Sequence, residues 1–181
     1  IEGEDYYPYS RDQKTLARKL AIPGTKGLEH RIGGLEKEDV SGNVSYDPEN
    51  HEKMVNIRKE KILRISNVIP KQDVYGKKEG DLLVVGWGGT YGTLYSVVED
   101  FLKNSFSIGL CHFNYINPLP TNTGTIFNKF KKIVVCELNS GQFANYLRMN
   151  FENIEFKQYN KIQGLPFTTT ELESHFKKLF L

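Results

Sequence analysis

Residues 81–92, DLLVVGWGGTYG, join an unbroken apolar run to a group of glycines and then to a helix-like repeat. Leu82–Val85 lacks any alternation of apolar and polar residues, which is typical of a strand covered on both faces in a parallel sheet. Four glycines follow, and from Tyr91 onward apolar residues recur at helical spacing. The stretch therefore predicts a buried strand, a tight turn and a helix, which together form the first half of a βαβ unit.

The residues that follow continue the alternation of strands and helices. We expect the first helix to end near Asn104. After it we expect a strand at 106–113, a short helix at 125–131, a strand at 132–137, a helix at 142–150, an edge strand at 154–159 and a last helix at 170–179. Thr170-Glu171-Leu172-Glu173 is interpreted as the capping box of the last helix. The pattern indicates a three-layer α/β/α domain with a mostly parallel sheet of four to five strands.

The residues before this domain have a different composition. Residues 1–46 carry prolines, glycines and scattered apolar residues without periodicity, and we interpret them as an extended arm or interdomain connector that is ordered by contact with a larger protein. Asp47-Pro48-Glu49 predicts a helix start, and the helix should run to about Asn67 before Pro70. The predicted organisation is an arm over 1–46, a helix and loop over 47–80, and the α/β domain over 81–181.

Composition excludes several classes of partner. The 181 residues include 24 basic and 22 acidic side chains, and the net charge of +2 gives no reason to expect nucleic acid as a partner. No apolar run approaches the ~20 residues that a membrane span requires, so we expect no membrane partner and a cytoplasmic location. Cys111 and Cys136 lie in apolar strand-like runs and are predicted to be reduced core thiols. Two thiols cannot supply the four ligands of an iron–sulfur cluster.

The glycine-rich turn also fits a dinucleotide-binding pattern superficially, because glycines at a strand-to-helix turn let a pyrophosphate approach the helix N-terminus. That pattern also needs an acidic residue after the second strand, which here ends in Cys111-His112-Phe113-Asn114. Gly88, Gly89 and Thr90 are kept as a candidate turn or anion site. The alternative function is a stand-alone Rossmann-like module that binds a nucleotide or anion at this turn.

Three polar residues stand at predicted carboxyl ends of strands, where α/β proteins place ligands. His112 ends the second strand, and Glu137 and Asn139 end the third. Each also has a structural interpretation, a hydrogen-bonded histidine in the first case and a helix N-cap in the others. Nothing in the α/β domain by itself describes an active site.

The arm concentrates charged residues in a segment that is expected to lie along a surface. Arg11, Asp12, Arg18, His30 and Arg31 belong to this group. An arginine fork there could bind a carboxylate bidentately, and a salt bridge to whatever the arm packs on is the structural alternative.

A set of motifs spread in order over nearly the whole chain resembles the C-terminal part of the α subunit of a 2-oxoacid:ferredoxin oxidoreductase, with the 2-oxoglutarate branch the closer match. The motifs are PYSRD at 8–12 with Arg18 and Pro23-Gly24, GLEHRIGGLE at 27–36, DPENHEKM at 47–54, GDLLVVGWGGTYG at 80–92, NYINPLP at 114–120, ELNSGQ at 137–142 and YNKIQGLPF at 159–167. The chain has GWGGTYG where GWGSTYG is usual, a change that affects no chemistry.

The resemblance implies a transketolase C-terminal-like domain and the activity of the parent enzyme. That enzyme decarboxylates a 2-oxoacid on thiamine diphosphate with Mg, passes electrons through an iron–sulfur cluster to ferredoxin and releases an acyl-CoA. Its partners here would be the N-terminal domains of the α subunit, the β subunit and, indirectly, ferredoxin. The motifs for those cofactors are missing from this sequence, so we expect the chain to bind none of them, to serve as a structural and subunit-interface part, and to be inactive alone.

The resemblance also implies two site residues in the arm. Arg18 matches the family arginine shortly before the Pro-Gly turn, which is implicated in holding the substrate carboxylate, and Thr25 would line the same pocket. No catalytic residue and no metal ligand is predicted. The 2-oxoacid, the oligomeric state and the order of the arm in isolation do not follow from the sequence.

Overall fold

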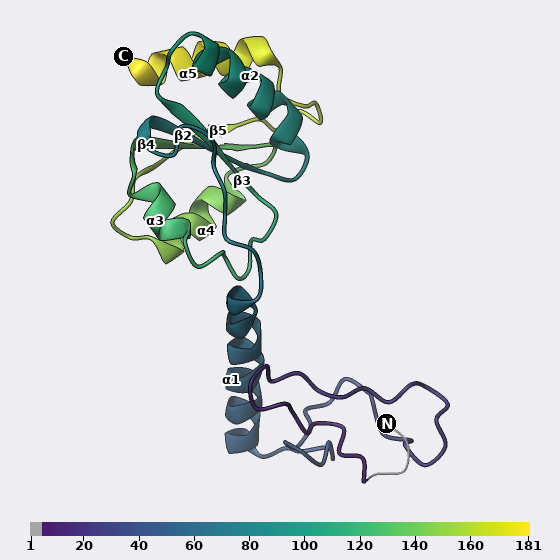
Figure 1. Ribbon diagram of the computed structural model, residues 1–181. Coiled ribbons are helices and arrows are strands. Elements are labelled where there is room, and N and C mark those ends of the chain that lie inside the picture. Colours follow the sequence, from purple (N-terminus) through teal and green to yellow (C-terminus); the bar gives the residue numbers. More distant parts are fainter. Residues whose placement is uncertain (1–4) are drawn as a thin grey trace. The chain divides into compact units, whose positions relative to one another are not determined.

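The computed structural model describes residues 5–181 and divides the chain into two compact units, Ile1–Val68 and Ile69–Leu181. The first four residues of the predicted arm lie outside the described residues. The three-part division into 1–46, 47–80 and 81–181 stays a prediction. The two units are described separately below (Figure 1).

The first unit contains the arm and one helix. Helix α1 spans Pro48–Arg64 and continues into the single 3₁₀ turn η1, Ile65–Asn67. Asp47 is the N-cap and its carboxylate accepts the Glu49 N–H at 3.0 Å, while Pro48 occupies the first helical position, where its missing N–H costs nothing. The predicted helix start is therefore confirmed, and the predicted end at Asn67 includes the 3₁₀ turn.

The arm folds back on itself through isolated bridges instead of forming a sheet. Antiparallel bridges join Tyr9 to Val40, Arg11 to Arg18, and Lys37 to Val44. Few arm side chains are buried, and among them are Leu28 and Lys37. Because so little apolar area is covered, polar contacts must define much of the arm's conformation.

The second unit is built on a five-stranded sheet with the order β1-β3-β2-β4-β5. The strands are β1 (Tyr75–Gly76), β2 (Gly80–Trp87), β3 (Ile108–Phe113), β4 (Phe130–Glu137) and β5 (Phe156–Asn160). Strands β2, β3, β4 and β5 run parallel to one another, and β1 pairs antiparallel with β3. Strand β5 lies at an edge, as its alternating sequence predicted.

Helices cover both faces of this sheet. They are α2 (Tyr91–Lys103), α3 (Thr123–Phe127), α4 (Gln142–Asn150) and α5 (Thr169–Phe180). Helices α2 and α5 lie on one face, and α3 and α4 on the other (Figure 1). Leu82 and Val84 of β2 point into the core under α2 and α5, whereas Leu83 and Val85 point into the core under α3 and α4. The central strand is thus buried on both faces, and the predicted three-layer α/β/α fold class is confirmed.

Several details differ from the prediction, among them the starts of β3 and β5, each two residues later than expected. The predicted loop over 72–80 contains the short strand β1. This strand has only two residues, too few for a sequence pattern to reveal it. Helix α3 begins at Thr123 and β4 at Phe130, each two residues early. The predicted capping box at Thr170 and Glu173 is wrong: Thr168 is the N-cap of α5, its hydroxyl accepts the Glu171 N–H at 3.3 Å, and the Glu171 carboxylate accepts the Thr168 N–H at 2.9 Å.

Candidate functional site

The turn between β2 and α2 needs glycine at two positions. A Cβ on Gly86 would stand 2.3 Å from Leu94 Cδ1 and 2.8 Å from Thr90 Oγ1, and Gly88 has a φ of +59°. Gly89 has open space around its Cα, so a serine would fit there. The glycines therefore allow close packing of α2 on β2. Position 89 has glycine where the resembling family usually has serine, and this difference leaves the turn intact.

Thr90 closes this turn. Its hydroxyl donates to the Trp87 carbonyl at 2.9 Å and accepts the Trp87 N–H at 3.2 Å. Only 5% of Thr90 is exposed. The hydroxyl is thus engaged within the 3₁₀ turn η2, Gly88–Thr90, instead of pointing to solvent. A role of Gly88, Gly89 and Thr90 in anion binding stays a prediction.

Glu137 is fully buried and organises the carboxyl ends of β2 and β4. Its carboxylate accepts the N–H groups of Phe143 at 2.8 Å and Ala144 at 3.0 Å in the first turn of α4, and the Trp87 indole N–H at 3.2 Å. The Asn139 side-chain oxygen accepts the Gly141 and Gln142 N–H groups at 2.8 and 3.0 Å. Both side chains therefore accept N–H groups at the start of α4, as the structural interpretation expected, although the N-cap residue itself is Gly141.

His112 borders a cavity of about 370 Å³ in the second unit, together with Lys71, Tyr91 and Tyr115. The His112 ring packs edge-on against Tyr91, with the ring centroids 5.0 Å apart. Burial lowers the pKa of the imidazole, so the ring is neutral at neutral pH. Its Nε2 is buried without a hydrogen-bond partner among the described residues. Asp73 lines the same cavity, and its carboxylate pairs with Lys78 at 2.7 Å.

In the arm, Arg18 lies on the wall of a separate cavity of about 370 Å³, which Tyr9, His30 and Arg31 also line. The Arg18 guanidinium stands over the Tyr9 ring, 4.3 Å from the centroid, and one of its N–H groups donates to the Pro8 carbonyl at 3.3 Å. Both contacts are to neutral groups. The guanidinium is therefore oriented by the protein, and within residues 5–181 no carboxylate pairs with it.

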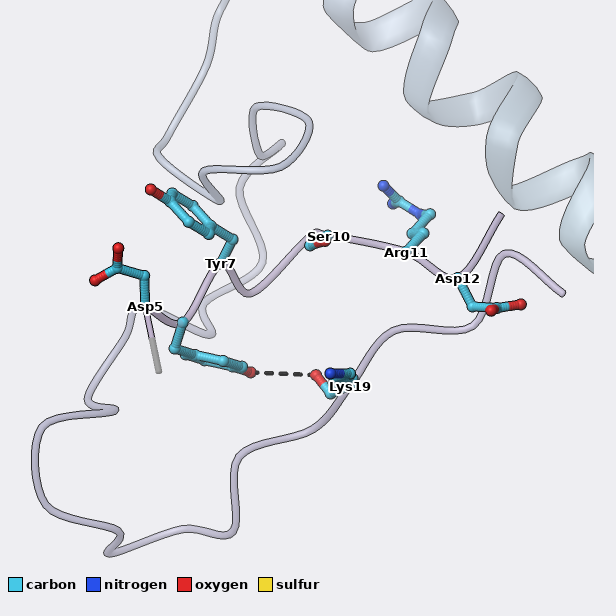
Figure 2. Close-up of a pocket in the computed structure, with 7 residues that line it drawn as sticks. Asp5, Tyr7, Ser10, Arg11, Asp12 and Lys19 are labelled. Carbon is cyan, nitrogen blue, oxygen red and sulfur yellow. Dashed lines mark hydrogen bonds between the residues drawn. The ribbon is translucent and has the colours of Figure 1, made fainter. Parts of the chain in front are cut away.

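Two other charged arm residues are used inside the arm. Arg11 donates to the Asp39 carboxylate at 2.6 Å and to the Tyr9 carbonyl at 2.9 Å. Asp12 accepts the Thr15 N–H and hydroxyl, both at 2.7 Å, and these bonds lower its pKa. Figure 2 shows both side chains around a neighbouring cavity of about 330 Å³. Among the five charged candidates of the arm, structural contacts therefore account for Arg11 and Asp12.

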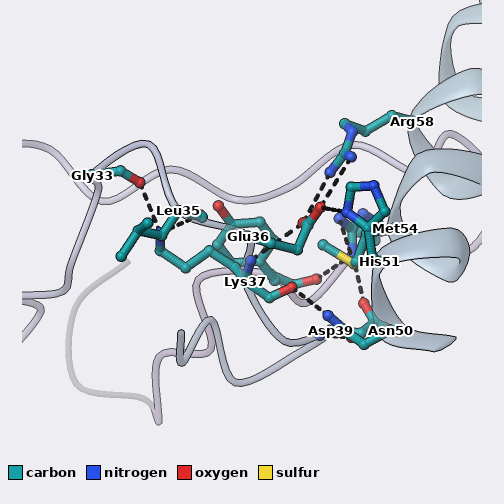
Figure 3. A network of polar contacts seen from close by, with 11 residues as sticks. Gly33, Leu35, Glu36, Lys37, Asp39, Asn50, His51, Met54 and Arg58 are labelled. Atoms are coloured by element: carbon teal, nitrogen blue, oxygen red, sulfur yellow. Dashed lines mark hydrogen bonds and ion pairs between the residues drawn. The ribbon is translucent and has the colours of Figure 1, made fainter. Parts of the chain in front are cut away.

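A polar network fixes residues 33–39 of the arm on α1 (Figure 3). Lys37 is 1% exposed, and its ammonium donates to the carbonyls of Gly33 and Leu35, each at 2.7 Å. Asn50 of α1 donates to the Lys37 carbonyl at 2.9 Å. Glu36 pairs with Arg58 at 3.3 Å and with His51 at 2.6 Å. The hydrogen bond from Arg58 lowers the Glu36 pKa most, the hydrogen bond from His51 lowers it further, and the resulting pKa is about 2.

Thr25 lies in the turn after Pro23. Its hydroxyl and its N–H donate to the Ile22 carbonyl at 2.8 and 3.1 Å, and Gly24 has a φ of +91°. Thr25 is not among the residues that line the Arg18 cavity. Its predicted place in a substrate site stays a prediction.

The cavity also contains residues that the sequence did not single out. Tyr6 and Tyr9 form part of its wall, and Tyr6 packs edge-on against His30 with centroids 5.1 Å apart. His30 Nδ1 lies 2.9 Å from the Leu28 carbonyl, which can only accept, so Nδ1 carries the proton. The run of three tyrosines at 6, 7 and 9 was the available signal, because tyrosine rings often orient arginine.

No metal site is formed within the part of the chain that the structure describes: no three His, Cys, Asp or Glu residues are grouped to hold an ion. Burial raises the pKa of the Cys111 and Cys136 thiols, which lie on β3 and β4. Two separated, protonated thiols do not fit an iron–sulfur cluster. None of the helices within 5–181 has the length and apolar content needed to cross a bilayer.

Comparison with known proteins gives two curated relatives. The 2-oxoglutarate oxidoreductase subunit KorA of Mycobacterium tuberculosis is 40% identical over 171 residues, which is 94% of this chain and 26% of that protein. The 2-oxoacid:ferredoxin oxidoreductase subunit alpha of Saccharolobus solfataricus is 26% identical over 148 residues, 78% of this chain and 23% of that subunit. The predicted resemblance to 2-oxoacid:ferredoxin oxidoreductase α subunits is confirmed. The chain spans about a quarter of the length of these subunits.

A solved structure agrees at the level of the fold. The 2-oxoglutarate:ferredoxin oxidoreductase from Magnetococcus marinus, with 2-oxoglutarate, coenzyme A and succinyl-CoA bound, superposes with a TM-score of 0.88 and 24% identity over 99% of this chain and 32% of that one. No family model matches the chain. A chain of that oxidoreductase thus contains the same fold over 99% of the length of this chain.

Proposed function

We propose that the chain is part of the α subunit of a thiamine-diphosphate-dependent 2-oxoacid:ferredoxin oxidoreductase that acts on 2-oxoglutarate and forms an acyl-CoA. The observation that carries the proposal is 40% identity to a 2-oxoglutarate oxidoreductase subunit over 94% of the chain. The working enzyme would also need the remaining α-subunit domains, a β subunit and ferredoxin as acceptor. Thiamine diphosphate, Mg and the iron–sulfur cluster would be held by those parts.

The second unit is assigned a scaffold role in this enzyme. Its best-organised polar group, Glu137, has its carboxylate engaged by N–H groups of the fold, and the Thr90 hydroxyl is engaged by Trp87. Groups that are already satisfied by the protein have little capacity left for a ligand. The same engagement disfavours the alternative of a self-sufficient nucleotide module at residues 86–92.

The arm is assigned the substrate contact, through Arg18. The planar guanidinium presents five donors, and one of them is used by the Pro8 carbonyl. The other edge of the fork can bind the 2-oxoacid carboxylate bidentately, which a lysine cannot do. In the reaction, thiamine diphosphate supplies the carbanion chemistry when bound, while Arg18 orients the substrate and holds its negative charge.

The test uses the complete α/β complex with coenzyme A and a viologen acceptor. Replacing Arg18 with Ala should lower kcat/KM for the preferred 2-oxoacid by about tenfold to a hundredfold, the usual contribution of a charged hydrogen-bond pair. Arg18→Lys should recover part of the loss. Lys59→Ala, an exposed cation on α1, is the matched control and should leave the rate unchanged.

An unchanged rate in the Arg18→Ala complex would remove Arg18 from the substrate site. Titration of the isolated chain with NAD, CoA and ATP tests the alternative function. Tight binding of any of these by the chain alone would contradict the scaffold role of the second unit.

A further inference from the structure

The Arg18 cavity contains more positive charge than one carboxylate requires. Both Arg18 and Arg31 line it, and no acidic side chain is among its lining residues. Arg31 has neither an ion pair nor a side-chain hydrogen bond within residues 5–181. Two guanidinium groups in one small cavity repel each other unless anions lie between or beside them.

Within the part of the arm that the structure describes, the two acidic residues that form ion pairs, Glu36 and Asp39, have partners other than Arg18 and Arg31. Asp39 is paired with Arg11 at 2.6 Å and Lys53 at 2.8 Å, and Glu36 is paired with Arg58 and His51. Three of these pairs join the arm to α1, and the pair of Arg11 with Asp39 lies within the arm. The excess positive charge of the cavity is therefore available to a ligand.

The rest of the cavity wall is largely apolar. Leu20, Ala21, Pro23 and Ile32 form this part, and the cavity volume of about 370 Å³ falls in the range of small-molecule sites. Leu20 and Ile32 are 74% and 78% exposed, so their apolar surface is accessible. A cavity that two cations and several apolar side chains line together is complementary to a short methylene chain with a carboxylate at each end.

We propose that Arg31 binds the second carboxylate of a dicarboxylic 2-oxoacid, and that this contact makes the enzyme select dicarboxylic over monocarboxylic substrates. The inference rests on the proposed function, in which Arg18 binds the carboxylate beside the oxo group. One guanidinium fork satisfies one carboxylate bidentately, so a second fork in the same cavity is matched by a second carboxylate. The methylene groups of the substrate lie against Leu20 and Ile32.

The test compares two substrate analogues that differ only in the second carboxylate. Glutarate and pentanoate have the same five-carbon chain, and each is measured as a competitive inhibitor of the complete α/β complex. In the Arg31→Met variant, which keeps the apolar part of the side chain, the glutarate inhibition constant should rise by about tenfold to a hundredfold. The pentanoate constant should change by less than about threefold. Arg31→Lys should lie between wild type and Arg31→Met for glutarate.

The outcomes separate this inference from the proposed function. If Arg18→Ala weakens glutarate and pentanoate alike and Arg31→Met weakens glutarate alone, both stand. If Arg18→Ala weakens both acids while Arg31→Met weakens neither, or both equally, the inference is overturned and the proposed function is kept. If Arg18→Ala changes neither binding nor turnover, the proposed substrate site itself is wrong. Circular dichroism spectra matching wild type must accompany each variant, so that a loss of affinity reports the site and not unfolding.

Discussion

The Arg18 guanidinium stands 4.3 Å from the centroid of the Tyr9 ring. Tyr9 is in turn fixed by an antiparallel bridge to Val40, in which its N–H donates to the Val40 carbonyl at 3.2 Å. The Arg18 side chain would otherwise sample many rotamers at a site that is mostly exposed to water. The ring therefore orients the arginine that we assign to the substrate carboxylate.

Replacing Tyr9 with Leu should raise KM for the 2-oxoacid by about three- to tenfold with little change in kcat. A cation–π contact of this kind contributes about 0.5–2 kcal/mol. Without it, substrate binding must also order the Arg18 side chain, which weakens the binding. Tyr9→Phe keeps the ring face and should behave like wild type. Steady-state kinetics of the complete complex measure both constants, and equal effects of Leu and Phe would exclude the ring as the cause.

Gly42→Ala should produce the same kinetic change without altering any residue of the cavity. Gly42 has a φ of +74°, and a Cβ there would stand 2.9 Å from Tyr9 Cδ2. The added methyl group must displace the ring or strain the backbone by about 1–2 kcal/mol. We expect a higher KM for the 2-oxoacid, measured beside Gly34→Ala, where nothing lies within 4 Å. A normal KM in the Gly42→Ala complex would contradict the link between Tyr9 position and substrate binding.

The second unit was predictable from sequence because its pattern is local. A parallel strand that is buried on both faces has an uninterrupted run of apolar residues in the sequence. Leu82–Val85 is such a run, because its side chains point into the cores on both faces of the sheet. The short strand β1 and the N-cap Thr168 were missed for different reasons. Two residues carry no periodicity, and three consecutive threonines offered competing caps that only the Glu171 contact distinguishes.

The arm was less predictable because its conformation depends on contacts between residues far apart in sequence. The charge pattern named Arg18, His30 and Arg31 but could not separate them from Arg11, which pairs with a carboxylate 28 residues away. Nor does a sequence show that Lys37 is buried with two carbonyls as its partners. These distinctions require the bridges and turns that bring the arm back on itself.

Gly86→Ala should destabilise the chain, whereas Gly89→Ser should not. The Cβ at position 86 would overlap Leu94 and Thr90, and overpacking of this kind costs about 1–3 kcal/mol. Position 89 has open space, so serine should change the free energy of unfolding by less than about 0.5 kcal/mol. Urea unfolding followed by circular dichroism compares the two variants. Equal stability of both would show that α2 packs less closely on β2 than these distances imply.

Glu36→Gln should remove part of the acid sensitivity of the first unit. The hydrogen bond from Arg58, and after it the hydrogen bond from His51, lower the Glu36 pKa from 4.5 to about 2. A lowered folded-state pKa contributes stability that is fully present above pH 4.5 and is lost as the pH falls toward 2. The variant should therefore be less stable at neutral pH and show a flatter dependence of the free energy of unfolding between pH 4.5 and 2.

Asp39 provides the comparison for this experiment. Burial acts to raise its pKa, but the hydrogen bond and charge of Lys53 and the charge of Arg11 lower it overall. Protonation of Asp39 at low pH therefore also lowers the stability of the first unit, as protonation of Glu36 does. Asp39→Asn should add to the effect of Glu36→Gln, because the two carboxylates have separate partners. A wild-type slope in the Glu36→Gln variant would show that the Arg58 and His51 contacts are not formed in solution.

Glu137→Gln should destabilise the second unit by about 2–3 kcal/mol, because a buried acceptor of charged hydrogen bonds is replaced by a group that also donates. One carboxylate oxygen accepts the N–H groups of Trp87 and Phe143, and the other accepts that of Ala144, so the new amide places a donor against a donor. Thr168→Ala removes the N-cap of α5, whose hydroxyl accepts the Glu171 N–H, and should cost about 1 kcal/mol. Trp87 is the one tryptophan in the sequence, and its emission reports the indole bond directly. Glu137→Gln should shift this emission in the folded protein while Thr168→Ala leaves it in place, and an equal response of both variants would contradict a specific bond between Glu137 and Trp87.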